Sequence, residues 1–225
     1  MSEFPKSDLN TVKRLPKRGH YDRDVIYPIV DEALICHVGF AVEGMPYVIP
    51  TIHTRIGDTI YLHGAVANRM LNHIKQGQSV CITVTHIDGI VFARSVFHHS
   101  MNYRSAVLFG KGRVVETYEE KWKVFEALTE HIAKGRWNDA RKPNEVEDKT
   151  TAIVAIEIES ASAKMRSGPA GDEEEDYALP VWAGVLPVRM EFGPPEKDAP
   201  LPETVEMPEY IKNYTRKGKR REIDN

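Results

Sequence analysis

The sequence has little of what marks several common protein classes. Its 225 residues include only two cysteines, Cys36 and Cys81. Their wide spacing fits two core thiols better than a disulfide framework or a zinc site. No apolar run approaches the ~20 residues that span a bilayer, and the N-terminus has no apolar signal core. We therefore expect a cytoplasmic protein without a membrane partner.

The net charge and the absence of nucleotide-binding motifs exclude further classes of protein. The formal net charge is −3, which argues against a nucleic-acid partner. The glycine-rich fingerprints of Rossmann and P-loop nucleotide sites are absent, and so is the serine nucleophile elbow. His98 and His99 are adjacent, so on an extended chain they point to opposite sides, and no metal site is expected.

The hydrophobic pattern predicts one strand-rich core. Hydrophobic residues make up 41% of the chain, and short β-type runs alternate with turn signals at 43–46, 56–58 and 86–89. Helical spacing is confined to about 22–34, 66–76 and 119–134. The predicted strands cover 36–42, 47–54, 59–62, 79–85, 90–96, 103–115 and 151–158. This order favours a mainly β (α+β) fold, a small antiparallel barrel with helices outside it.

Composition changes at both ends of this core. Residues 1–22 are polar and basic and are expected to form an N-terminal arm that can lie across a partner subunit. Residues 23–165 form the predicted barrel domain. Residues 166–225 are rich in proline and charge. This C-terminal extension contains an apolar stretch around Trp182, which is expected to pack on the barrel or on a partner subunit.

The segment from Tyr61 to Arg69 points to a bound phosphate. It leads from a β-type run through His63, Gly64 and Ala65 into a helix, and free N–H groups at a helix start suit an anion. Arg69 lies at the end of the helix where the dipole disfavours a cation, so a bound anion would resolve the conflict, although a solvated arginine is the alternative. His63 either faces a ligand or is hydrogen-bonded at the barrel rim.

A second polar segment opens a long strand. Asn102, Tyr103, Arg104 and Ser105 precede an apolar run and could form a hydrogen-bonding rim for a heteroaromatic ring. Ordinary strand alternation, in which every second residue faces water, explains them equally well.

Together these motifs resemble a known family. The residues are Tyr61-x-His63-Gly64-Ala65, Asn68-Arg69, Ala93-Arg94-Ser95, His98-His99-Ser100-Met101-Asn102-Tyr103-Arg104-Ser105 and Phe109-Gly110. The pattern is similar to that of the flavin-binding split-barrel proteins related to pyridoxamine 5'-phosphate oxidase, nearest to the nitroimidazole-resistance branch. It covers roughly residues 12–160, and the Trp182 segment is a further match.

The resemblance implies a six-stranded antiparallel split barrel that forms a homodimer, with FMN at the subunit interface and a small-molecule substrate. In the nitroimidazole-resistance branch, the histidine that matches His63 is implicated in redox chemistry. The resemblance therefore implies that His63 is the catalytic residue. The implied FMN-binding residues are Pro50, Thr51, Ile52, His53, His63, Gly64, Ala65, Asn68, Arg69, Asn102, Tyr103, Arg104, Ser105 and Trp182.

The function that follows is that of an FMN-dependent oxidoreductase. Two alternatives stay open. The protein could store or carry flavin without turnover, or it could bind haem in a similar barrel, with His63 or His37 as the axial ligand.

Overall fold

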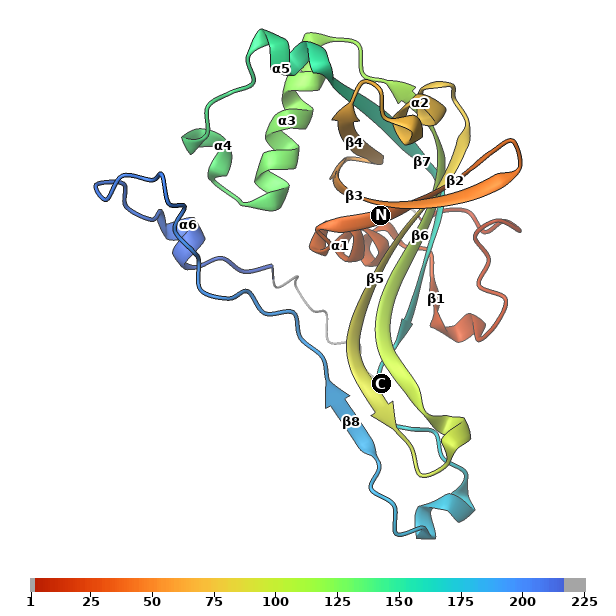
Figure 1. Ribbon diagram of the computed structural model, residues 1–225. Coiled ribbons are helices and arrows are strands. Elements are labelled where there is room, and N and C mark those ends of the chain that lie inside the picture. Colours follow the sequence, from red (N-terminus) through yellow and green to blue (C-terminus); the bar gives the residue numbers. More distant parts are fainter. Residues whose placement is uncertain (1–2, 217–225) are drawn as a thin grey trace.

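A computed structural model describes residues 3–216 of the chain (Figure 1). The sheet runs in the order β1-β7-β4-β3-β2-β5-β6, and additional pairing between β6 and β7 closes a barrel. Strand β8 extends the sheet beside β5. The strands are β1 (Gly19–His20), β2 (Ile35–Val42), β3 (Met45–Ile56), β4 (Thr59–Ala65), β5 (Ser79–Phe92), β6 (Ser100–Val114), β7 (Thr151–Arg166) and β8 (Gly184–Pro187). The predicted mainly β split-barrel fold is confirmed.

Helices close and flank the barrel. They are α1 (Arg23–Glu32), α2 (Arg69–Lys75), α3 (Tyr118–Ile132), α4 (Arg136–Asp139), α5 (Glu145–Thr150) and α6 (Glu209–Lys212), with short 3-10 turns at Pro16–Arg18, Val96–His98 and Glu174–Ala178. Apolar residues of α1 and α2 join the main core, whereas α3 packs on the outside over a second, smaller cluster. Within the described residues no helix is long and apolar enough to cross a membrane.

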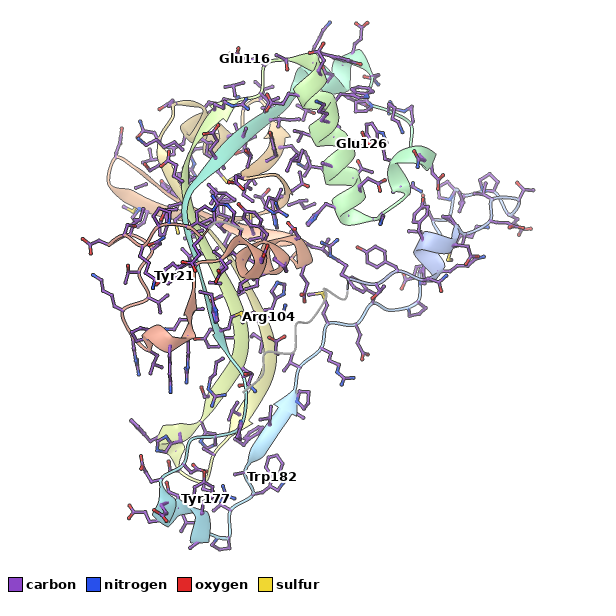
Figure 2. The ribbon with its side chains drawn as sticks, turned by 180° about the vertical axis from the view of Figure 1, so that it is seen from behind. Tyr21, Arg104, Glu116, Glu126, Tyr177 and Trp182 are labelled. Carbon is purple, nitrogen blue, oxygen red and sulfur yellow. The ribbon has the colours of Figure 1, made fainter. Side chains whose placement is uncertain are left out.

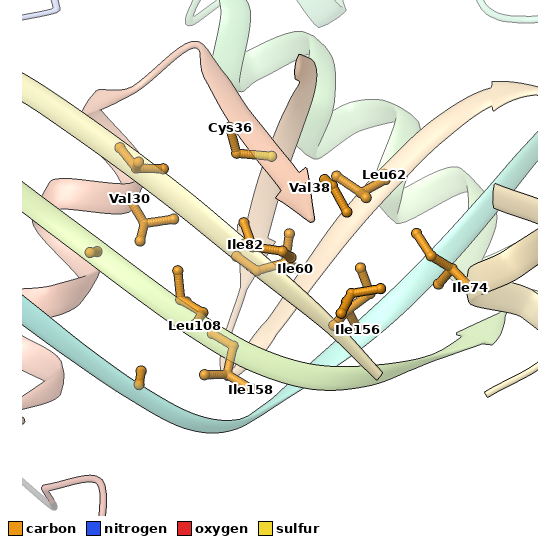
Figure 3. Close-up of a cluster of buried hydrophobic side chains, with 14 of the residues drawn as sticks. Val30, Cys36, Val38, Ile60, Leu62, Ile74, Ile82, Leu108, Ile156 and Ile158 are labelled. Carbon is orange, nitrogen blue, oxygen red and sulfur yellow. The ribbon is translucent and has the colours of Figure 1, made fainter. Parts of the chain in front are cut away.

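Strand alternation fills the barrel. Successive side chains point to opposite faces, and the inward set is aliphatic and almost fully buried, as with Val38, Ile82, Leu108 and Ile156. Figure 3 shows these side chains interleaved between the strands. Burial of this apolar surface is the main term that favours the fold.

The strand β5 departs from the sequence prediction. The predicted turn at 86–89 is wrong, because β5 runs unbroken from Ser79 to Phe92. It pairs with β6 throughout, and a bulge between Ile87 and Gly89 absorbs the extra residue, Asp88. Ladder pairing with β6 and β8 outweighs the local turn preference of this stretch. One core prediction also needs correction, since Cys36 is buried but Cys81 is only partly buried.

The N-terminal segment packs on its own barrel. Phe4 is 2% exposed, and the buried Asn10 side-chain amide donates to the Ala161 carbonyl at 3.1 Å. Strand β1 pairs with β7 of the same chain. The described part of this segment therefore packs along β7 of its own subunit, and the predicted contact with a partner subunit stays a prediction.

The C-terminal extension forms a strap that is tied at both ends. It leaves β8 beside β5 and returns to the helices, as Figure 1 shows. Residues 189–207, which we call the strap, are exposed throughout. Beyond it, Arg216 donates from Nε to the Glu32 carbonyl at 3.1 Å and from a terminal nitrogen to the Asp31 carbonyl at 3.1 Å. A cation at these carbonyls complements the C-terminal end of α1.

The buried His53 and the partly buried His131 link the end of α1 to β3 and α3. The ring of His53, on β3, is 0% exposed, with Nε2 3.0 Å from the Val30 carbonyl. His131, on α3, lies 3.3 Å from Arg216 and 5.2 Å, ring to ring, from His53. Burial, helped by the charge of a protonated His131, lowers the pKa of His53 to about 4, and burial also lowers the pKa of His131.

These two histidines should make the fold acid-sensitive. Their folded pKa values lie below those of the unfolded chain, so the unfolded state binds more protons as the pH falls below about 6.5, and stability is lost. For His53 the loss between pH 7 and pH 4 should approach about 3 kcal/mol. Urea unfolding across this range is the measurement. His53→Gln should flatten the acid limb relative to the control His37→Gln, and an equal acid limb in both variants would contradict the assignment.

Candidate functional site

The site begins where β4 passes into α2. Asn68 caps α2, accepting the Leu71 N–H at 3.1 Å with its side-chain oxygen. Gly64 lets the helix start pack closely, since a Cβ there would lie 3.2 Å from a Leu71 methyl carbon. The capped helix start, Gly64 and Ala65 therefore lie together, and the helix begins at Arg69, later than the predicted start near residue 66.

His63 lies on β4 just before this junction. It pairs with Ile153 of β7. Its Nδ1 is buried without a hydrogen-bond partner among residues 3–216. Burial lowers its pKa, which favours the neutral ring. A buried nitrogen left without a partner is costly unless something else satisfies it, which fits a ring that meets a bound group.

The outer barrel face beside His63 is partly exposed, and the residues that the strand register places on it include no Asp, Glu, Lys or Arg. Strand register places Ile35, His37 and Gly39 of β2 opposite Ile52, Pro50 and Val48 of β3, with Cys81 and Thr83 of β5 next to them. Ile35 is 42% exposed and Val48 is 67% exposed. Pro50 and Ile52 contribute to this face, whereas His53 points into the core. A broad face without charge is suited to a planar ligand or to another subunit.

Arg69 and His73 line a cavity on the outer side of α2. The cavity measures about 300 Å³ and is lined by Val42, Ala67, Arg69, Asn72, His73 and Gln76. The Arg69 guanidinium lies 4.5 Å from the centre of the Tyr47 ring. It forms no ion pair among the described residues, so its charge is available to a bound anion.

The side chains of the second predicted segment, residues 102–105 of β6, alternate between the two faces of the sheet. Arg104 points to the opposite face from Tyr103 and Ser105, toward the end of α1. Its guanidinium contacts Glu32 at 2.6 Å and Asp88 at 2.9 Å. Burial would raise the pKa of Glu32, but Arg104 holds it below its ordinary value. Arg104 is thus already paired with two carboxylates.

Two further predicted residues lie away from the β4–α2 junction. Asn102 donates to the Gly168 carbonyl at 3.1 Å and so fixes the chain after β7. Trp182 is 71% exposed and lies 5.9 Å from the Phe92 ring, far down the projecting β5–β6 arm (Figure 2). Within one subunit Trp182 does not reach His63, so a site that includes both needs a second chain.

Sequence reasoning missed the aromatic wall beside α2. Phe40 and Tyr47 are paired across β2 and β3 and stack at 5.4 Å, and His73 lies 5.1 Å from Phe40. Arg69 and His73 are four residues apart, a spacing that puts two side chains on one face of a helix, but His73 was not among the predicted site residues. The spacing could not show the hairpin that packs beside them. Among residues 3–216 no group of three or more His, Cys, Asp or Glu side chains is placed to hold a metal ion.

Comparisons with solved structures cover nearly the whole chain. It is 37% identical to the flavocytochrome Anf3 from Azotobacter vinelandii, with a TM-score of 0.86 over 92% of this chain and 96% of that one. It is 29% identical to the FAD and haem binding protein from Mycobacterium smegmatis, with a TM-score of 0.83 over 87% and 96%. A putative 5-nitroimidazole antibiotic resistance protein from Bacteroides thetaiotaomicron is 25% identical, with a TM-score of 0.56 over 65% and 85%.

The comparison with curated proteins found no match. The family model described as pyridoxamine 5'-phosphate oxidase matches residues 22–165, which include the barrel, the β4–α2 junction and the exposed outer face. The chain therefore belongs to the pyridoxamine 5'-phosphate oxidase family.

Proposed function

We propose that the protein is a redox protein that binds a flavin and a haem and acts on a small molecule. The observation that carries this proposal is the similarity to flavocytochrome Anf3. It extends over 92% of the chain, and so reaches beyond the barrel that the family model covers. The flavin would accept or donate hydride and electrons, and the haem would pass single electrons, while the protein binds and orients both. A cytoplasmic location stays a prediction.

For the flavin, the β4–α2 junction supplies the most suitable groups. Main-chain N–H groups at the start of α2, with Gly64 and Ala65, would hold the phosphate, and Arg69 would add charge. The isoalloxazine would lie on the outer face, where Pro50 is exposed and Ile52 is partly exposed. His63 would present its neutral ring there. His53 and Arg104 are already engaged within the fold, so we leave them out of this site.

FMN is the flavin that we propose, because the described residues offer one candidate phosphate locus, at the start of α2 with Arg69, and no dinucleotide fingerprint occurs in the sequence. FAD is the competing identity, which the name of the M. smegmatis relative favours. Both flavins would place their first phosphate at the same helix start.

The absorption spectrum of freshly purified protein tests the cofactor content. We expect two broad flavin bands together with one intense Soret band. Chromatography of the flavin released by denaturation should give mainly FMN. Recovery of FAD would overturn the FMN assignment alone, a missing Soret band would remove the haem, and a colourless protein that takes up neither cofactor would refute the proposal.

The variant Arg69→Ala tests the phosphate site. It should weaken flavin binding by about 1.5–3 kcal/mol, the range for hydrogen bonds to charged groups, or roughly ten- to a hundredfold in Kd. Fluorescence titration is the measurement. Riboflavin, which has no phosphate, should bind equally to parent and variant, and Lys75→Ala on the same helix is the control. Equal FMN affinity in Arg69→Ala and the parent would exclude this phosphate assignment.

A homodimer would complete the site. In one subunit, apolar side chains stay uncovered on the outer face, on the strap and at the tip of the β5–β6 arm, the turn that joins β5 to β6. Among them are Val96, which is 91% exposed, and Phe97, which is 88% exposed. In a twofold dimer the arm of one subunit can bring Trp182 to the flavin of the other. The interface would belong to the obligate class, above ~2,000 Å².

Light scattering over a wide dilution range should therefore report a dimer. Flavin that contacts both subunits stabilises the dimer by mass action, so added flavin should raise the Tm. Trp182→Ala should lower flavin occupancy and dimer stability, whereas Leu9→Ala, an exposed site on the N-terminal segment, should lower neither. A monomer that holds a full complement of flavin would refute the shared site.

A further inference from the structure

We infer that His73 is the axial haem ligand and that the cavity beside α2 holds part of the haem. This inference rests on the proposed function and gives it a location. It also replaces the two histidines, His37 and His63, that the sequence favoured for this role.

Most of the nine histidines are already engaged. A ring nitrogen lies within 3.0 Å of a main-chain carbonyl in four of them, His53, His86, His99 and His131. Such a bond is compatible with metal ligation, so the surroundings decide. His53 and His131 are packed against each other between α1 and α3. The other nitrogen of His86 faces Glu32 at 3.9 Å. His99 is exposed at the arm tip, and its neighbour His98 lies 3.5 Å from Glu173.

Of the remaining histidines, His20, His37, His63 and His73, it is His73 that lines the cavity beside α2. His37 is exposed on the flat sheet face. His63 lies at the junction already assigned to the flavin. A haem needs a recess beside its axial histidine to bury the macrocycle. A cavity provides such a recess, whereas a flat sheet face does not.

The groups around His73 match the chemistry of a haem. Its imidazole is at hydrogen-bond distance from no described residue, so a nitrogen is available to iron. Phe40, 5.1 Å away, limits the orientation of the ring. Val42 and Ala67 supply apolar walls. Arg69, one turn earlier on α2, places a cation where a propionate carboxylate could accept its N–H groups.

The size of the cavity says how the haem would be seated. A volume of about 300 Å³ is at the lower end for small-molecule pockets, so one edge of the macrocycle would extend beyond the mouth. The start of α2, assigned to the flavin phosphate, lies one turn from His73, so both cofactors would share this helix. Because Arg69 also belongs to the flavin proposal, the test rests on His73.

The test is titration of the full-length chain with haemin, followed in the Soret region. The parent should saturate at one haem per chain. His73→Ala should bind haem more weakly by at least about tenfold and lose the spectrum of histidine-ligated iron, and added imidazole should restore that spectrum. His73→Met should keep haem with a shifted Soret band, because the ligand atom changes. His37→Ala and His63→Ala, which remove the two rival ligands, should keep the Soret band of histidine-ligated iron.

The outcomes separate this inference from the proposed function. A parent that shows no saturable Soret change would refute haem binding altogether. A parent that binds haem while His73→Ala binds it equally, or while His37→Ala or His63→Ala loses it, would refute His73 alone. If His73→Ala retains flavin at the level of the parent, the variant is folded. If His73→Ala does not fold, the position of the Soret band of His73→Met shows whether residue 73 is the axial ligand.

Discussion

The two-residue repeat of the barrel strands is the constraint on which the rest of the structure depends. One set of side chains, such as Val38, Ile82 and Leu108, must fill the interior, and the alternate set is thereby fixed on the outside. A shift of one residue in any strand would exchange the two sets. The exposed outer face at Ile35, His37 and Pro50 is therefore a direct consequence of how the core is packed.

The position of the candidate site follows from how the barrel is closed. Helix α2 packs its Met70, Leu71 and Ile74 into one end of the main core. This packing directs the start of the helix toward the end of β4, beside His63, and leaves the polar side of α2 facing outward. Residues Arg69 and His73 lie on that side because Met70, Leu71 and Ile74 must lie on the other. The hydrophobic core thus positions the groups that can meet a cofactor.

Charged groups have two different roles in this fold. Arg104, Glu32 and Asp88 form a partly buried network that ties the base of the arm to α1, and Arg216 ties the C-terminal segment to the end of the same helix. Removing one partner of such a network leaves the other charges uncompensated. Arg69, by contrast, lies over an aromatic ring without a carboxylate partner among the described residues. The same residue type is structural in one place and available for a ligand in the other.

The sequence by itself determined the barrel and the passage from β4 into α2, because strand alternation and helix spacing are local patterns with a direct physical cause. It was misleading at 86–89, where a local turn signal was overruled by pairing with β6 and β8. Contacts between distant segments were decided only by the tertiary structure. These include the burial of His53 under α1, the pairing of Arg104 with Glu32 and the placement of His73 beside Phe40. No local pattern encodes them, since each joins side chains that come together only when the barrel closes.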